Sequence, residues 1–241
     1  MYVNTHIFFV NKKVINPSSL TIVGGFIPDI ALMGIIGWDD LHKKEIIEKF
    51  QKFISRTQPR LKDFGEGIMY HYIVDEVTHK HYKNDIGYAY KTITPKLIKL
   101  VSQSFQIENG EVAKTKAHTI IELAVDSFVL EKNPEILKQV KKATIAIDKE
   151  AVANILSSFF ELRKDKTRSA LKSYFLLSTK YDTRDMEDCV KLCNDMNVLL
   201  FNKTVDKDRT RQLMLYSRKL VENSYQEFLN VLRRVRRKQY I

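Results

Sequence analysis

Apolar side chains recur at intervals of three and four residues along most of the chain, which is the spacing of one face of an α-helix. Ile46, Ile47, Phe50 and Ile54 form one such stripe. The 241 residues include only 8 Gly and 5 Pro, too few for the many tight turns of an all-β protein. We therefore expect an all-α fold in which residues 1–241 form a single helical domain.

Helical period, capping residues and prolines predict where the helices lie. Pro28 ends an early helix, and Pro95 begins a short one. Asp39 or Asp40 is expected to cap a helix that reaches about Arg56. The remaining expected helices cover residues 5–14, 62–79, 111–132, 149–164, 167–180, 183–202 and 206–239, and Pro134 begins another.

One stretch has the length of a membrane span, namely LTIVGGFIPDIALMGIIGW from Leu20 to Trp38. Pro28 and Asp29 lie at its middle, and a carboxylate is unfavourable at the centre of a bilayer. We therefore expect two buried segments joined at this turn and no transmembrane segment. The N-terminal MYVNTHIFFVNKK has its lysines after its apolar residues, the reverse of a secretory leader, so we expect a cytoplasmic protein.

Positive charge is concentrated in the second half of the chain. Residues 127–241 carry +9 of the formal net charge of +11, and the final LRRVRRKQYI alone carries +5. Such a surface attracts nucleic acid or an anionic membrane. Lysine and arginine side chains also stabilise the C-terminal end of a solvent-exposed helix, because they offset its dipole. We expect residues 127–241 to supply helical support and a basic surface, which contacts nucleic acid, an anionic membrane surface or only solvent.

All six histidines lie in the first half of the chain, three of them in HYIVDEVTHKH, which begins at His71. His71 and Asp75 are four residues apart, as are His118 and Glu122, so each pair projects from one face of a helix. Asp126 continues the second face by one turn. Two helices of this kind, face to face, would enclose a metal ion. The histidine pattern therefore predicts a metal site built from residues 1–126.

Several other metal and phosphate motifs are missing from the sequence. It has no His-Glu-x-x-His, no His-Asp dipeptide and no glycine-rich phosphate loop. Glu76-Val-Thr-His79 is a single Glu-x-x-His, whereas a ferritin-like di-iron site needs two. These absences argue against a zinc metalloprotease, a His-Asp phosphohydrolase, a Walker-type nucleotidase and a ferritin-like protein.

HYIVDEVTHKH resembles the His-Tyr-x-x-Asp-x-x-x-x-x-His segment of the zinc-dependent phospholipase C family, whose fold single-strand-specific zinc nucleases share. GGFIPD, which ends at Asp29, resembles the Gly-x-x-x-Pro-Asp stretch of the phospholipase C/D-like branch. His6, His42 and the His118-x-x-x-Glu122 helix follow the order of the family's motifs. The resemblance covers about residues 1–130 and implies a multi-helix phospholipase C/zinc nuclease-like bundle.

The resemblance also implies a ligand set for two or three ions of zinc, or of another divalent metal. By position, His42, His71 and Asp75 would hold one metal. Asp75 would bridge to a second metal that His6 also holds. Asp29 would lie beside the bridging water as a base or an extra ligand.

By the same resemblance, His81, His118 and Glu122 would hold a further metal. Helix geometry alone favours His79, which is four residues after Asp75, so His79 and Asp126 stay open as supporting residues or alternative ligands. Secreted family members bind metal through an N-terminal tryptophan, whereas this chain begins Met1-Tyr2. Two and three metals are therefore both possible.

Phosphodiester cleavage needs a nucleophile at neutral pH and a place for negative charge, and adjacent metal ions supply both. We expect a metal-dependent phosphodiester hydrolase resembling phospholipase C, acting on a phospholipid or another phosphodiester. One alternative is a nuclease that uses the same site on single-stranded nucleic acid. Another is a non-catalytic helical protein that binds metal or a partner.

Overall fold

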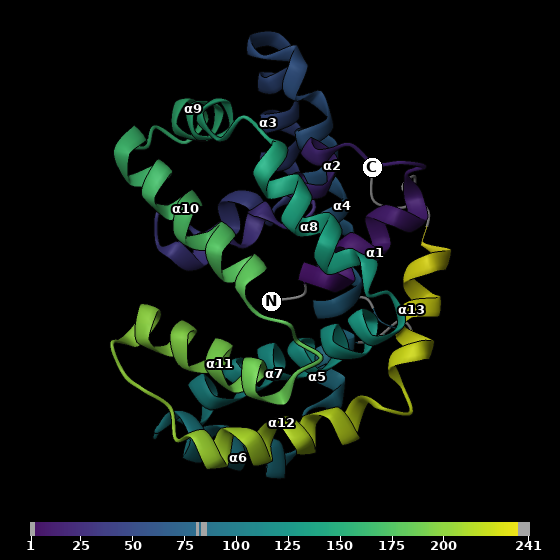
Figure 1. Ribbon diagram of the computed structural model, residues 1–241, viewed down its shortest axis with the longest axis vertical. Coiled ribbons are helices and arrows are strands. Elements are labelled where there is room, and N and C mark those ends of the chain that lie inside the picture. Colours follow the sequence, from purple (N-terminus) through teal and green to yellow (C-terminus); the bar gives the residue numbers. More distant parts are fainter. Residues whose placement is uncertain (1–2, 81, 83–85, 236–241) are drawn as a thin grey trace. The chain divides into compact units, whose positions relative to one another are not determined.

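The computed structural model describes residues 3–80, 82 and 86–235, and the regular secondary structure of these residues is helical (Figure 1). This confirms the prediction of an all-α fold. The helices of the first half are α1 (Val3–Lys13), α2 (Ser19–Gly24), η1 (Ile27–Met33), η2 (Trp38–Leu41), α3 (Lys44–Thr57), η3 (Pro59–Leu61), α4 (Lys62–His79), α5 (Tyr88–Thr92), α6 (Pro95–Phe105) and α7 (Gly110–Lys132), where η marks a 3-10 helix. Those of the second half are α8 (Glu135–Ala146), α9 (Lys149–Phe159), α10 (Lys164–Lys180), α11 (Met186–Phe201), α12 (Lys207–Val221) and α13 (Tyr225–Arg234).

Polar side chains begin many of these helices where the sequence predicts a start. The Thr94 hydroxyl accepts a hydrogen bond from the main-chain N–H of Leu97, and Pro95 is the first residue of α6. A side-chain oxygen next to the first turn satisfies a main-chain N–H that has no partner within the helix. The same kind of cap is made by Ser18, Asn109, Asp148, Asp185 and Asp206.

One predicted cap is wrong. Asp39 and Asp40 lie within η2, and α3 begins only at Lys44. The carboxylate of Asp40 instead accepts a hydrogen bond of 2.6 Å from the main-chain N–H of Gly37. The bond fixes a short 3-10 turn ahead of α3.

The single helix predicted over residues 206–239 is also wrong. The structure has two helices here, because α12 ends at Val221 and α13 begins at Tyr225. In the turn between them, the main-chain N–H of Ser224 donates to the carbonyl oxygen of Val221, and the Ser224 hydroxyl shares a 2.8 Å hydrogen bond with the hydroxyl of Tyr88. A turn with a tertiary contact therefore separates α12 from α13, where the helical period alone predicts one continuous helix.

The apolar stretch from Leu20 to Trp38 is divided among α2, η1 and η2, so it is not one continuous helix. The prediction of two buried segments is wrong for the second one, because residues 32–38 are half-buried or exposed. Pro28 lies in the first turn of η1, and Asp29 beside it is 5% exposed. In the part of the chain that the structure describes, every helix is too short or too polar to cross a membrane.

The chain forms two compact units. Unit 1 comprises Met1–Thr5, Glu76–Pro134 and Tyr181–Ile241, and unit 2 comprises His6–Asp75 and Glu135–Lys180. Each unit contains segments from both halves of the chain, and α1 and α4 each have residues in both units. The expectation of one domain, with support from residues 127–241, stays a prediction.

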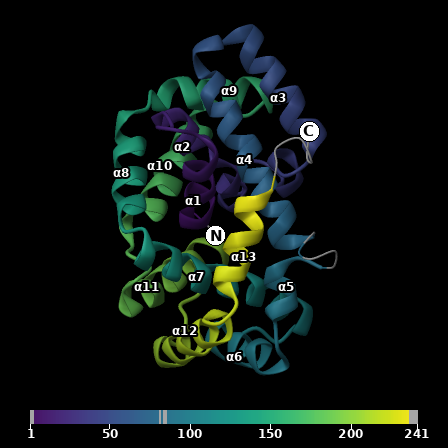
Figure 2. The ribbon, with the colours of Figure 1, turned by 90° about the vertical axis from the view of Figure 1, so that its right-hand side faces the viewer.

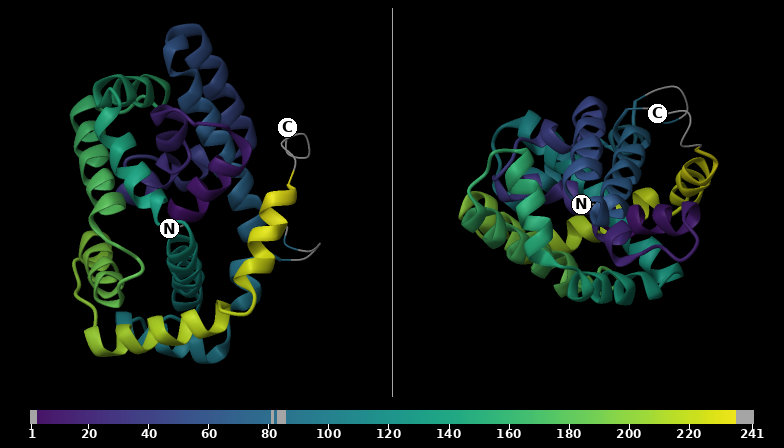
Figure 3. Two further views of the ribbon diagram at one scale, coloured as in Figure 1. Left: turned by 45° about the vertical axis from the view of Figure 1, so that its right-hand side comes forward. Right: turned by 90° about the horizontal axis from the view of Figure 1, so that it is seen from above.

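In unit 1, α6 packs against α7 and α12, and α12 also packs against α7 and α11 (Figures 1 and 3). Aromatic side chains fill the space between helices. The rings of Tyr88 and Phe228 stack with their centres 4.4 Å apart, and those of Phe128 and Tyr225 with their centres 4.6 Å apart. Large rings of this kind contribute much of a core's buried apolar area.

In unit 2, α2 packs against α8, and α10 packs against both α8 and α9 (Figure 2). The ring of Phe50, which belongs to the predicted apolar stripe of α3, lies between the rings of Phe64 and Phe159. The hydroxyl of Tyr174 donates to the main-chain oxygen of Phe26 at 2.6 Å. This buried hydrogen bond ties α10 to the turn that precedes η1.

Candidate metal centres

The first candidate centre is built around α4, which carries His71 and Asp75 one turn apart on a shared face. Two glycines let α2 approach this helix closely. A side-chain carbon on Gly67 would lie 2.3 Å from the carbonyl oxygen of Thr21, nearer than atoms can pack. The close approach brings the carbonyl oxygen of Gly25 to 3.1 Å from Nδ1 of His71. Since a carbonyl only accepts, Nδ1 of His71 carries the proton.

His42 follows the last residue of η2 and is fixed twice by Trp38. Its Nδ1 donates to the main-chain oxygen of Trp38 at 2.6 Å, and its ring stacks on the indole with ring centres 4.1 Å apart and planes 9° apart. Carbonyl acceptors on Nδ1 are typical of histidines that bind metal through Nε2. In their neutral forms His42 and His71 therefore both direct Nε2, the nitrogen without a proton, into the same space.

The ligand atoms of His42, His71 and Asp75 form a nearly equilateral triangle. Nε2 of His71 lies 3.3 Å from Nε2 of His42 and 3.2 Å from Oδ2 of Asp75, and the third side is 3.4 Å. Ligands 2.0–2.1 Å from a tetrahedral zinc are about 3.3–3.4 Å from one another. Two imidazole lone pairs and a carboxylate at these distances repel unless a proton or a metal ion lies among them, and the spacing of the three atoms fits a metal ion.

Asp29 and His6 lie beside this triangle. Oδ1 of Asp29 is 3.7 Å from Nε2 of His42 and 3.8 Å from Nε2 of His71. Nε2 of His6 is 3.5 Å from Oδ1 of Asp75, and its ring stacks on that of His71. Asp75 thus directs one oxygen to His6 and the other to the two remaining histidines, the arrangement expected of a bridging carboxylate. We call these five residues site A.

In site A, neighbouring charges shift the pKa values of Asp29 and His71 in the direction opposite to the effect of burial. Burial would raise the pKa of Asp29, but His42 and His71 outweigh it and lower that pKa below its usual range. Burial would lower the pKa of His71, but the carboxylates of Asp75 and Asp29 raise it instead. Site A therefore stabilises a positive charge on His71, and a bound metal ion would take the place of its Nε2 proton.

The second candidate centre, site B, consists of His79 at the end of α4 together with His118 and Glu122 on α7. Nε2 of His79 lies 2.7 Å from Oε1 of Glu122, and Nε2 of His118 lies 3.7 Å from the same oxygen. Glu122 is 5% exposed. Burial would raise its pKa, but His118 and His79 lower it, so the carboxylate is held in its charged form.

Site B fits a metal less closely than site A does. The 2.7 Å between His79 and Glu122 is a hydrogen-bond distance, shorter than the spacing of two ligands on a tetrahedral zinc. Tyr90 on α5 stacks on the ring of His118 with ring centres 5.0 Å apart. α5 reaches this position because Gly87 lies against the main chain at the end of α4, where a side-chain carbon would be 2.1 Å from the carbonyl carbon of His79.

Two further predicted site residues, His81 and Asp126, are not among the residues that define site A and site B. His81 lies outside the described residues, so its choice over His79 stays a prediction. Asp126 faces the first turn of α1: its oxygens accept hydrogen bonds of 2.9 Å from the main-chain N–H groups of Asn4 and Thr5, and one of 2.7 Å from the Thr5 hydroxyl. These contacts indicate that Asp126 caps a helix.

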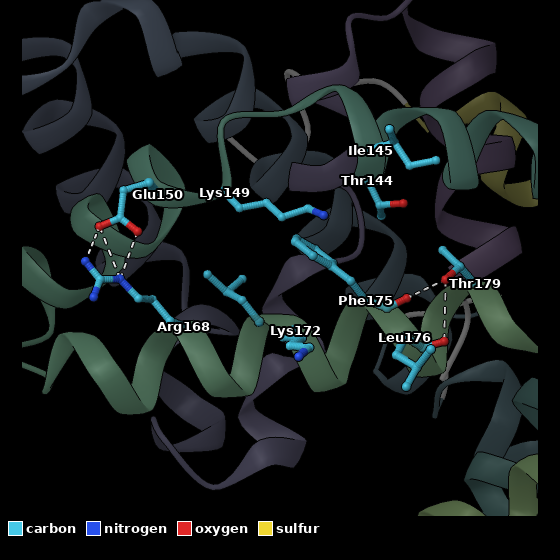
Figure 4. A pocket seen from close by; sticks show the side chains of 10 residues that line it. Thr144, Ile145, Lys149, Glu150, Arg168, Lys172, Phe175, Leu176 and Thr179 are labelled. Carbon is cyan, nitrogen blue, oxygen red and sulfur yellow. Dashed lines mark hydrogen bonds and ion pairs between the residues drawn. The ribbon is translucent and has the colours of Figure 1, made fainter.

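The pocket in Figure 4 is a separate feature of unit 2. Ile145 on α8, Lys149 on α9 and Phe175 on α10 line a cavity of about 340 Å³. Arg168 and Glu150 form an ion pair at one end, with 2.8 Å between Nε and Oε2. The residues that line this pocket belong to neither site A nor site B.

The main-chain oxygens of Gly25 and Trp38 are the functional groups that sequence reasoning missed. Every residue has a carbonyl group, so no residue type marks these two. The position of Trp38 four residues before His42 was the one available signal.

Comparison with family models, curated proteins and solved structures gave no match. The resemblance to the zinc-dependent phospholipase C family therefore rests on the motifs alone.

Proposed function

We propose that the protein is a metal-dependent phosphodiester hydrolase, with zinc the first candidate metal. The observation that carries the proposal is the triangle of His42, His71 and Asp75, whose sides of 3.2–3.4 Å match the ligand spacing of a tetrahedral zinc. The order of the motifs supports a phospholipase C/zinc nuclease-like arrangement of the helices as the finer fold. A cytoplasmic location stays a prediction.

Each residue of site A has a defined part in this proposal. His42, His71 and Asp75 would hold one metal, and the second oxygen of Asp75 with His6 would hold another. Metal bound there would lower the pKa of a water to about 7 and offset negative charge on the phosphate. The carboxylate of Asp29, at the edge of the triangle, would orient that water and accept its proton.

Zinc with only nitrogen and oxygen ligands keeps more Lewis acidity than zinc held by thiolates, which suits hydrolysis rather than a purely structural role. A metal ion held by these three ligands alone would still accept water or substrate as a further ligand. The proposed substrate is a phosphodiester, either a phospholipid or another ester of that class. Site B, with a hydrogen bond across it, is proposed as a weaker metal site.

The proposal is tested by hydrolysis of bis-nitrophenyl phosphate with the purified protein, before and after addition of zinc or manganese. We expect turnover that depends on the metal and that His71→Ala abolishes while the helical circular-dichroism signal is retained. Absence of hydrolysis under all metal conditions would reject the proposal.

A further inference from the structure

Trp38, the only tryptophan of the chain, connects site A to the surface. Its indole lies on the ring of His42, yet the residue is 45% exposed. A tryptophan buried on one side and wet on the other is typical of residues at a membrane–water interface. It therefore marks a surface that lies directly beside a candidate metal ligand.

The segment that leads to Trp38 is uncharged and apolar. Residues 32–38 read LMGIIGW, and Leu32, Met33, Ile35 and Ile36 are half-buried although they lie at the surface. Gly34 at its centre has φ of +69°, and a side-chain carbon added there would meet no atom within 4 Å. Partly exposed apolar side chains at nearly consecutive positions are more typical of a contact site than of a surface that only water covers.

The adjoining helix α3 supplies positive charge. η2, which contains Trp38, packs against α3. Lys49, Lys52 and Arg56 recur at helical spacing along the exposed face of α3, opposite its buried residues Ile47 and Phe50. They outnumber Glu45, which shares that face, and the carboxylate of Asp39 beside Trp38 pairs with Lys43 at 2.7 Å. Each lysine or arginine near an anionic lipid surface contributes about 1 kcal/mol of attraction. An apolar segment beside a basic helical face complements lipid chains and anionic headgroups.

We propose that residues 32–38 and the basic face of α3 dock the protein on an anionic lipid bilayer, with Trp38 at the interface. The four half-buried aliphatic side chains favour a bilayer over single-stranded nucleic acid, which would need mainly aromatic surface for base stacking. Docking would bring site A next to lipid phosphodiesters. That last consequence rests on the proposed function, whereas the docking itself does not.

The test is binding of the full chain to vesicles of phosphatidylcholine alone or with one quarter phosphatidylserine. Because Trp38 is the only tryptophan, its fluorescence reports this surface directly. We expect a blue shift of the emission and co-sedimentation with the anionic vesicles, both weakened by salt. Equal results with Ile36→Asp and wild type, or no binding to either vesicle, would overturn the proposal.

Two further variants keep the test independent of folding. The double change Lys49→Glu and Lys52→Glu alters exposed side chains only and should weaken binding by at least about tenfold at low salt. Leu215→Asp is the matched control, because Leu215 is 56% exposed on α12, outside the proposed surface. It should bind as wild type does.

Two outcomes separate this proposal from the proposed function. Vesicle binding without hydrolysis of bis-nitrophenyl phosphate would retain docking and reject the hydrolase. Hydrolysis of this soluble ester without vesicle binding would retain the hydrolase and reject docking. A shift of the Trp38 emission by a single-stranded oligonucleotide, but not by vesicles, would also reject docking and would assign the surface to nucleic acid.

Discussion

At the scale of the residue, Asp75 is the side chain on which the proposed metal binding of site A depends most. Its two oxygens face different histidines, with His6 on one side and His42 and His71 on the other. Asp29, the other carboxylate of site A, lies farther from His42 and His71, at 3.7 and 3.8 Å. The pivotal role that the motif resemblance gives to Asp75 therefore has a geometric counterpart.

Asp75→Asn should remove most metal from site A and reduce hydrolysis by at least about 100-fold, because an amide is a poor metal ligand and offers one oxygen instead of two. Metal content and turnover are measured on the same preparation. The control is Glu66→Gln, which neutralises a half-buried carboxylate on the same helix. Equal losses in the two variants would contradict a specific role for Asp75.

Asp126 gives a prediction about pH. Burial raises its pKa to about 7, although the donors of Asn4 and Thr5 act in the opposite direction. A carboxyl whose pKa is raised on folding contributes stability at low pH that is lost as the pH rises through the folded value. Relative to Asp126→Asn, the wild type should therefore lose up to about 4 kcal/mol of unfolding free energy between pH 4 and 7.

The measurement is urea unfolding of both proteins across this pH range. Above about pH 8, where the carboxyl is ionised in both states, the difference between them should be constant. A wild-type advantage that instead grows as the pH rises would show that the carboxylate is ionised and held by the first turn of α1.

At the scale of the element, the crossing of α2 and α4 positions His71. Gly67→Ala would place a carbon 2.3 Å from the Thr21 carbonyl oxygen and 2.8 Å from the main chain of Gly24. Because both neighbours are main chain, the helices must separate, and the loss of stability should be about 3 kcal/mol. Separation also moves the Gly25 carbonyl from His71, so zinc affinity should fall by about 10–100-fold.

Gly110→Ala provides the comparison, since a side-chain carbon on Gly110 at the start of α7 meets no atom within 4 Å. It should unfold within about 0.5 kcal/mol of wild type, or be slightly more stable. Chemical unfolding and zinc titration of both variants measure the two effects. Similar behaviour of the two alanines would mean that the crossing is not tight.

The same element shows how far the sequence could predict the site. The pairing of His71 with Asp75 follows from helical geometry and needed no other information. That Asp29 and His42 would join them depended on the motif resemblance, because helical period does not specify which helices meet. Asp126 shares the helical face of Glu122, yet it contacts α1, a long-range packing choice that no local pattern encodes.

At the scale of the whole molecule, metal binding should appear as stability. A ligand that binds only the folded chain at 100 times its dissociation constant adds about 2.7 kcal/mol, which raises the melting temperature of a chain of this size by about 5–10 °C. Zinc should therefore stabilise the wild type, and a chelator should reverse the effect. Asp75→Asn should respond much less, whereas an equal response would place the stabilising metal elsewhere.

The proposed function requires that the chain binds metal. The direct measurement is the number of metal ions per chain in the purified, dialysed protein, by elemental analysis with and without added zinc. We predict two or three zinc ions for each wild-type chain and at most one for Asp75→Asn. A wild-type chain that retains no metal, and that neither zinc nor manganese activates, would contradict the account.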